Sequence, residues 1–391
     1  MWSNIIGQER IKEILKNFYK SGKLSHAFIF YGNEGTGKDA AAIEFAKLLN
    51  CDSPLNGSEA CDSCKSCIET DSLKSQMLRF VTALPAGKND SDDDSNPLEK
   101  LEKEDFENYL SEIELKAEDK YHTVSIPKAN DIRISSIRQL KKEIYMTGRS
   151  GKKKVFLISR CEMMNTQSAN SLLKILEEPP NDSVIILTTS RINSLLPTIV
   201  GRCQSIRFDV IPNNKIITYI KQKSNAVTDE NAAFIAGISE GSISKCNQLL
   251  NNNYLDLREK VIDTLVSILS GHSLKLGNSI DFIIGKKDKA RIKNFLVFLI
   301  IWFRDIINIS SGNGDQIINR DKKERLISFA GKYDSDNYMI ISSIEDAITD
   351  IEKNVIPELI LYNLFFSISS LMKKKSDLTA PHTALTSKNP E

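Results

Sequence analysis

The sequence predicts an α/β fold, a doubly wound parallel sheet carrying a phosphate-binding loop, followed by helical domains. Three observations lead to this prediction. An apolar stretch at Ala27–Tyr31 precedes a glycine-rich loop at residues 32–39, and a helical pattern runs from Ala40 to Leu49. Two further apolar stretches, Val155–Ile158 and Ser183–Thr189, have a helical pattern between them. Strands that alternate with helices are typical of a parallel sheet with helices on both faces.

The glycine-rich loop reads Gly-Asn-Glu-Gly-Thr-Gly-Lys-Asp and follows the pattern G-x-x-x-x-G-K-[ST] except at its last position. Glycines allow backbone N–H groups to close around phosphate, and the lysine reaches the outer phosphates. A plain glycine-rich turn is the alternative, and the strand before the loop and the helix after it argue against it. The candidate nucleotide-binding residues of the loop are Gly32, Gly35, Gly37, Lys38 and Asp39.

The acidic half of a nucleotide hydrolase site is missing. Asp39 replaces the hydroxyl residue that binds Mg²⁺, and the strand at Val155–Ile158 is followed by Ser159 and Arg160 instead of acids. A carboxylate about 4 Å from a phosphate costs on the order of 4 kcal/mol at a surface-like dielectric unless Mg²⁺ bridges the two. We therefore expect ATP and Mg²⁺ to bind weakly or not at all.

Composition and charge predict a multidomain cytoplasmic protein. The chain has 391 residues, 41% of them hydrophobic, which suggests two or three domains. No secretory signal opens it, and no apolar run is long enough to cross a membrane. Residues 90–120 contain 13 acidic residues and 4 lysines and have a net charge of −9. Because the whole chain has a net charge of +1, the rest of it carries +10. A moderately basic body tolerates nucleic acid nearby but does not establish contact.

Four of the seven cysteines fall in one short segment. Cys51, Cys61, Cys64 and Cys67 form two overlapping C-x-x-C units with one upstream cysteine. Four thiolates at this spacing predict a closed, tetrahedral structural zinc site. Disulfides are the alternative in an exported protein, a redox pair would follow a thioredoxin-like strand, and an iron–sulfur cluster also uses four cysteines.

Residues 71 to about 125 read as an acidic insertion. The segment begins with an extended stretch at Leu78–Leu84, and residues 87–97 have the composition of a partly disordered loop. Leu98–Lys120 has helical composition and predicts a charged surface helix. We interpret the acidic surface of this segment as a solvated face. The alternative is that it docks a partner or excludes DNA.

A basic helix follows the insertion. Its apolar positions are Ile134, Ile137 and Leu140, and basic side chains surround them. The basic side chains of this helix and those before the strand at Val155–Ile158 either approach DNA phosphates or are simply solvated at the surface. The basic residues are Arg133, Arg138, Lys141, Lys142, Arg149, Lys152, Lys153 and Lys154.

Several motifs together resemble one family. Residues 171–180 read Ser-Leu-Leu-Lys-Ile-Leu-Glu-Glu-Pro-Pro, residues 187–189 Leu-Thr-Thr, and residues 196–203 Leu-Pro-Thr-Ile-Val-Gly-Arg-Cys. With Gly-Gln-Glu at residues 7–9, His-Ala-Phe at residues 26–28 and the four-cysteine segment, they resemble the clamp-loader subunits of bacterial DNA polymerase III. The resemblance covers nearly the whole chain except about residues 71–125 and implies an AAA+ fold.

The resemblance also implies roles for single residues. Arg202 matches the arginine finger that such subunits insert beside ATP bound by a neighbour, although Gly201 replaces the preceding serine. Thr189 matches a γ-phosphate sensor. Ser244 stands where active motors carry a lid arginine. The metal hydroxyl, the acidic strand end and the lid arginine are thus all altered, which is the pattern of the delta-prime type and not of the gamma and tau motors.

The family pattern implies three domains. Residues 1–210 form the nucleotide-binding-like domain, with the zinc module at 50–68, and residues 211–265 a small helical lid. Residues 266–375 form an all-α collar for oligomerisation, because Phe295–Asp305 resembles the family's Trp-x-Arg-Asp helix and residues 354–364 its last helix. The composition from Lys373 onward predicts a mobile tail, which we count as a separate segment at 376–391.

The implied function is that of a stator in DNA replication. It would donate Arg202 to a neighbouring motor without turning over ATP itself, as part of a DNA-directed DNA polymerase holoenzyme. The implied partners are gamma/tau-type motors and a delta-type subunit in a hetero-oligomeric ring, with the sliding clamp and primer-template DNA reached through the complex. An active gamma/tau-like ATPase and a DNA-binding helicase-loader-type AAA+ protein are the alternatives.

Overall fold

The computed structural model of the chain describes residues 1–87, 96–145, 151–180, 182–224, 226–251, 255–270, 273–285, 288–353 and 355–375. The chain divides into two compact units, Met1–Ser224 with Ser239–Asn247, and Asn225–Ile238 with Gln248–Glu391. The segment expected to form the lid is therefore shared between both units. The three-domain division stays a prediction.

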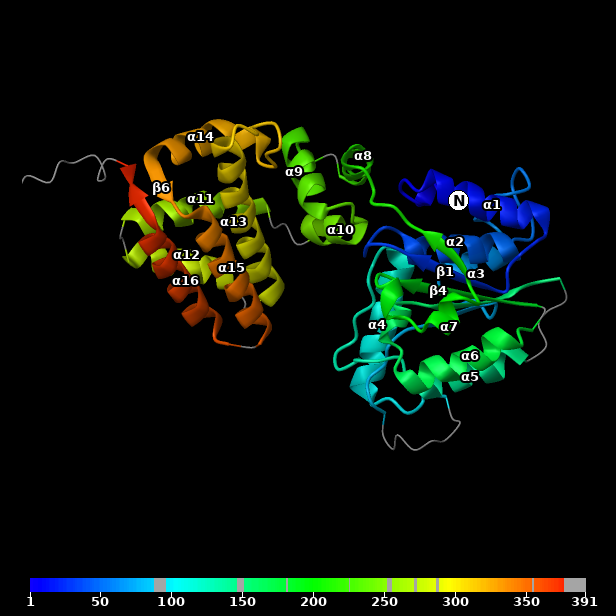
Figure 1. The fold of residues 1–391 in the computed structure, drawn as a ribbon. Helices are drawn as coiled ribbons and strands as arrows, with labels where there is room; N and C mark the ends of the chain where they lie inside the picture. Colours follow the sequence, from blue (N-terminus) through cyan, green and yellow to red (C-terminus); the bar gives the residue numbers. More distant parts are fainter. Residues whose placement is uncertain are drawn as a thin grey trace, which may run out of the picture. The chain divides into compact units, whose positions relative to one another are not determined.

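The first unit contains a five-stranded parallel sheet in the order β2-β3-β4-β1-β5, which confirms the predicted α/β parallel-sheet fold. In Figure 1, α1 and α2 cover one face of this sheet, and α5 and α6 cover the other. Every residue of β4 is buried, as expected for a central strand between two layers of helices. The strands are β1 Ala27–Tyr31, β2 Leu78–Val81, β3 Lys154–Ile158, β4 Ser183–Thr189 and β5 Gln204–Arg207.

The helices of the first unit start and stop on local signals. Asn165 caps α6 by accepting a hydrogen bond from the Ser168 N–H at 2.9 Å. Gly37 has φ 93°, a conformation that favours glycine, and it turns the chain from the loop into α2. The helices are α1 Glu9–Ser21, α2 Lys38–Asn50, α3 Lys65–Asp71, α4 Lys103–Glu118, α5 Ile134–Tyr145, α6 Thr166–Glu177, α7 Pro197–Val200 and α8 Asn213–Lys223. Helix α10, Ile243–Asn251, begins in this unit.

The second unit is mainly helical. Its longest helix, α13, buries Phe295, Phe303 and most of the apolar residues between them, as expected for a buried helix. The unit also contains a two-stranded antiparallel sheet of β6 Tyr333–Ser335 and β7 Met372–Lys374, which the all-α prediction missed. The helices are α9 Asp229–Ser239, α11 Leu255–Ser270, α12 Ser273–Ile284, α13 Lys289–Ser310, α14 Lys323–Lys332, α15 Asn337–Glu352 and α16 Pro357–Leu371.

Two expectations require correction. Lys373 and Lys374, assigned to the tail, pair within β7. Helix α4 lies within the range of the predicted surface helix, but its Lys116 is buried at 2% exposure, so the helix is not solvated throughout. Residues 88–95 of the insertion, Arg149, Asn354 and the expected tail at 376–391 lie outside the described residues. Within the described residues, no helix is both long and apolar enough to cross a membrane.

Candidate functional site

The phosphate-loop region forms a pocket of about 230 Å³ at the carboxyl ends of β1, β3 and β4. Five of the six predicted nucleotide-binding residues line it: Gly35, Gly37, Lys38, Asp39 and Thr189. Gly32 lies behind them, where a Cβ would stand 2.3 Å from the Phe208 carbonyl oxygen, so only glycine fits there. The predicted residues are thus brought together in one place.

The loop lysine is directed at its own loop. Lys38 Nζ donates to the carbonyl oxygens of Gly32 at 2.8 Å and Asn33 at 2.6 Å. Burial lowers the pKa of Lys38, although the neighbouring Asp39 carboxylate opposes the shift. Two of the three ammonium donors are therefore engaged by the chain itself.

Asp39 is the centre of a polar cluster. Its carboxylate accepts hydrogen bonds from Lys116 Nζ at 2.9 Å, Ser159 Oγ at 2.8 Å and Thr188 Oγ1 at 2.6 Å. Burial alone would raise the pKa of Asp39, but the Lys116 charge and these hydrogen bonds outweigh it and lower the pKa. The carboxylate is consequently ionised and fully engaged within the chain.

A short strap, which we define as residues 119–123, lies against the loop. The Tyr121 ring is 3.0 Å from where a Gly37 Cβ would stand, and its hydroxyl accepts from the Ile6 N–H at 2.7 Å. Ser244 Oγ donates to the Tyr121 carbonyl oxygen. The Ile243 N–H also donates to the Gly35 carbonyl at 2.9 Å. Ser244, which was expected to stand in place of a lid arginine, thus contacts the strap.

Sequence reasoning missed Lys116, Tyr121 and Glu162 as pocket residues. Glu162 accepts from Ser190 Oγ at 2.9 Å, and its other carboxylate oxygen is buried without a hydrogen-bond partner. Lys116 lies in an acidic insertion, 77 residues from Asp39. No local pattern in the sequence connects these positions.

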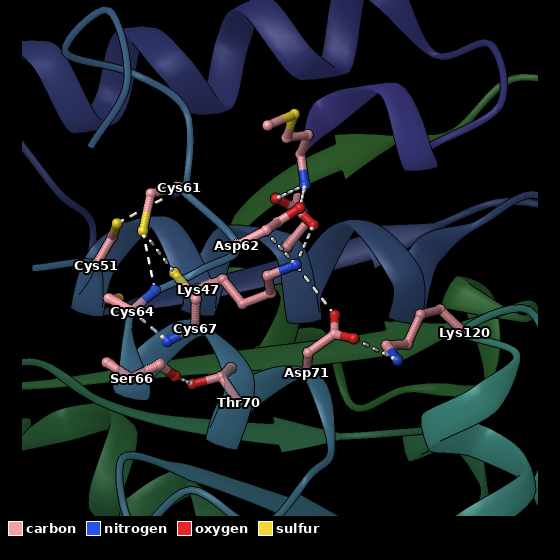
Figure 2. A network of polar contacts seen from close by, with 12 residues as sticks. Lys47, Cys51, Cys61, Asp62, Cys64, Ser66, Cys67, Thr70, Asp71 and Lys120 are labelled. Atoms are coloured by element: carbon pink, nitrogen blue, oxygen red, sulfur yellow. Dashed lines mark hydrogen bonds and ion pairs between the residues drawn. The ribbon is translucent and has the colours of Figure 1, made fainter. Parts of the chain in front are cut away.

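The four predicted cysteines converge. The sulfur atoms of Cys51, Cys61, Cys64 and Cys67 lie within 4.8 Å of one another, and those of Cys61 and Cys67 are 3.9 Å apart (Figure 2). Tetrahedral zinc with Zn–S bonds near 2.3 Å places its sulfurs about 3.8 Å apart, whereas a disulfide requires about 2.05 Å. The arrangement fits four-coordinate metal binding.

The surroundings of the sulfurs also suit metal-bound thiolates. Cys51, Cys61 and Cys64 each accept a backbone N–H bond at 3.3–3.4 Å. Hydrogen bonds from Ser63 and from the Cys64 N–H lower the pKa of Cys61 to about 6, while burial raises the pKa of Cys67. Because every ligand must be a thiolate, the cluster would release protons when a metal binds.

An ion-pair network joins this cluster to α2. Lys47 of α2, only 2% exposed, contacts Asp62 at 2.7 Å, Asp71 at 3.0 Å and Glu44 at 3.2 Å. Asp71 also contacts Lys120 at 3.3 Å (Figure 2). Asp62 lies between two of the cysteines, and Lys120 lines the pocket. The cysteine segment is thereby attached to the helix that starts at the phosphate loop.

Arg202 lies apart from the residues that line the pocket, after α7. Its guanidinium donates to the Thr198 carbonyl at 3.1 Å and contacts a Glu177 oxygen at 2.9 Å, while 39% of the side chain remains exposed. The side chain is thus oriented by two contacts but still accessible. Its role as a finger stays a prediction.

A second hollow of about 750 Å³ lies between α5 and α6. Four basic side chains line it, together with polar residues and Tyr145. The basic residues are Arg138, Lys141, Lys142 and Lys174. A groove with this charge suits a polyanion.

Comparison with known proteins matches residues 7–212 to the family described as DNA polymerase III, delta subunit. DNA polymerase III subunit delta' of Bacillus subtilis is 28% identical over 319 residues, which are 80% of this chain and 81% of that protein. The gamma/tau subunit of Mycoplasma genitalium is 30% identical over 257 residues, 64% of this chain but 35% of that protein. A solved gamma subunit-related protein from Thermotoga maritima has 14% identity and a TM-score of 0.44, covering 93% of this chain and 98% of that chain.

Proposed function

The chain belongs to the DNA polymerase III delta subunit family, and from this membership we propose that it is a clamp-loader subunit of delta-prime type. It would act as a stator in a hetero-oligomeric ring with gamma/tau-type motors and a delta-type subunit. Its contribution to catalysis would be Arg202, presented to ATP on a neighbour. The sliding clamp and primer-template DNA would be reached through the complex, in the cytoplasm.

The observation that carries this proposal is the composition of the pocket. Asp39, Ser159 and Ser244 all line it. By the family pattern, they match the metal-binding hydroxyl, the strand-end acid and the lid arginine of active motors. In active motors the hydroxyl and the strand-end acid hold Mg²⁺, and the lid arginine senses phosphate. The joint replacement of these three groups supports a subunit without ATP turnover. An active gamma/tau-like ATPase would need at least the metal ligands.

The exposure of Arg202 supports the donation of a finger. A planar, permanently charged guanidinium beside a γ-phosphate stabilises developing negative charge, worth roughly 10³ to 10⁵ in rate in related hydrolases. The contact with Glu177 is partly exposed, so it costs little to rearrange when a neighbour docks. Gly201 leaves the backbone there without the serine of related motifs.

The second unit offers a surface for assembly. Helix α16 exposes an apolar stripe at intervals of three to four residues, which places its members on one helical face. An exposed apolar stripe of this kind marks an interface with another chain. The stripe consists of Leu359, Tyr362 and Phe366, preceded by Ile356 at the N-cap of the helix. In the first unit, the cysteine cluster would hold a structural zinc, and the basic hollow between α5 and α6 would face DNA.

Reconstitution tests the proposal. ATP hydrolysis is measured for the isolated chain and for the ring assembled with its motor subunits, clamp and primed DNA, using wild type, Arg202→Ala and the control Arg207→Ala. Arg207 is an exposed arginine of β5. We expect no turnover by the isolated chain and a loss of stimulated hydrolysis only with Arg202→Ala. Turnover by the chain alone would favour the gamma/tau-like alternative.

A further inference from the structure

The pocket contains the elements of a magnesium site with two of them exchanged. In phosphate-loop hydrolases, the residue after the loop lysine supplies a hydroxyl and the strand end supplies a carboxylate, and Mg²⁺ lies between them. Here Asp39 supplies the carboxylate from α2, and Ser159 supplies the hydroxyl from the end of β3. The two groups are in direct hydrogen-bond contact at 2.8 Å.

A positive charge from the chain completes this cluster. The Lys116 ammonium reaches Asp39 Oδ2 at 2.9 Å and the His122 carbonyl oxygen at 2.7 Å. Its side chain is 2% exposed and that of Asp39 is 17% exposed. Ser159 and Thr188, which donate to the same carboxylate, are also buried. A buried carboxylate requires such a counter-charge, because an unpaired charge in this position would be strongly unfavourable.

We propose that Lys116 is a built-in cation that takes the place of Mg²⁺ and holds this pocket in shape independently of nucleotide. Lys116 belongs to the acidic insertion, and the strap anchors this insertion at the pocket. Tyr121 covers Gly37, and Ser244 and Asn247 hold the strap at Tyr121 and at Asp119, the latter at 2.7 Å. The phosphate loop is therefore held in shape by contacts within the chain. This inference concerns the isolated chain and rests on neither Arg202 nor the partners of the proposed function.

Charge-pair variants of the full chain test the inference by thermal unfolding. The variants are Lys116→Met, Asp39→Asn and the double variant that carries both changes. Lys103→Met is the matched control, because Lys103 lies on the same helix and is 91% exposed. Unfolding is followed by Trp2 fluorescence in a Trp302→Phe background, since Trp2 is the buried tryptophan of the first unit.

We expect Lys116→Met to lower the melting temperature by on the order of 6 to 20 °C, because it leaves the largely buried Asp39 carboxylate without a counter-charge. The double variant removes both charges and should recover roughly half of this loss or more, since the two residues are coupled. Lys103→Met should match wild type. Equal melting of the Lys116→Met and Lys103→Met proteins would overturn the proposal. If Lys116→Met does not fold, a double variant less stable than Asp39→Asn alone would overturn it.

Magnesium ions provide the second measurement. Millimolar MgCl2, compared with KCl of equal ionic strength, should leave the melting temperature of wild type unchanged, because Lys116 fills the cation position. The same addition should raise the melting temperature of Lys116→Met, where the oxygens of Asp39, Ser159 and Thr188 become available to a hard cation. Stabilisation of wild type by Mg²⁺, or none of Lys116→Met, would contradict the assignment of Lys116 as the cation.

Discussion

The replacement of Lys47 by methionine tests how the cysteine segment is attached to the helix behind the phosphate loop. Lys47 is 2% exposed and lies among Glu44, Asp62 and Asp71. Methionine keeps most of the apolar stem but removes the ammonium. Three carboxylates then lose this shared counter-charge, although Glu44 and Asp62 keep the N-terminal ammonium of Met1 and Asp71 keeps Lys120. Glu44, at 5% exposure, cannot be solvated in place of the lost ion pair.

The magnitude follows from the burial of each partner. Removing one side of a buried ion pair costs about 3–5 kcal/mol, and exposed pairs contribute about 0–1 kcal/mol. Asp62 and Asp71 are 30% and 49% exposed, so they regain part of their hydration. We therefore expect Lys47→Met to cost about 2–4 kcal/mol, a fall in melting temperature of about 4–16 °C for a unit of this size.

Thermal unfolding followed by Trp2 fluorescence in the Trp302→Phe background measures this loss. Trp2 donates to the Ser58 carbonyl at 3.1 Å, within the cysteine-containing segment, so its signal reports the relevant region. Lys65→Met is the matched control, because Lys65 is 86% exposed and contacts Glu69 at 3.7 Å. Equal melting temperatures for Lys47→Met and Lys65→Met would refute the reasoning from burial.

Three further outcomes follow from the contacts. Removal of metal by a chelator, or the change Cys64→Ser, should expose Trp2 to quenching. Metal affinity should fall as the pH falls, because the thiolates become protonated, and affinity independent of pH would contradict four-thiolate binding. The pKa of Asp39 is lowered in the folded chain. The difference in stability between wild type and Asp39→Asn should therefore be constant above about pH 5 and shrink only as the pH falls below about 4. Melting curves across pH check this, and loss of the difference near pH 6 would contradict it. Phe366→Lys should weaken assembly with the motor subunits in size-exclusion chromatography but leave the melting temperature nearly unchanged, since the side chain is 65% exposed.

The elements that the sequence predicted well are those with local signals. The strands at Val155–Ile158 and Ser183–Thr189 are continuous apolar runs, and such runs are typical of parallel strands buried on both faces. The cysteine cluster was predictable because metal-ligand spacing is itself local. Helix α4 was also visible from the helical composition of Leu98–Lys120, and the buried helix α13 from the apolar run at Phe295–Phe303.

What the sequence did not predict depends on contacts between distant segments. Lys116 has the same local pattern as any lysine on a charged helix, and only the fold brings it to Asp39. Strands β6 and β7 are three residues each and lack an alternating pattern, so their pairing carries no local signal. The hydrogen bond from Ser244 to the Tyr121 carbonyl likewise forms only because the insertion folds back over the phosphate loop.

The single-turnover rate of ATP hydrolysis in the reconstituted ring tests whether Arg202 acts at the ATP site of a neighbouring subunit. The ring is assembled with wild type, Arg202→Lys or Arg202→Ala, with clamp and primed DNA bound and ATP saturating. Lysine keeps the charge but loses the planar fork, so it should restore little of the rate. We expect hydrolysis at the adjoining motor site to slow by roughly 10³-fold or more with Arg202→Ala, while the ring stays assembled. An unchanged rate in an intact ring would contradict it.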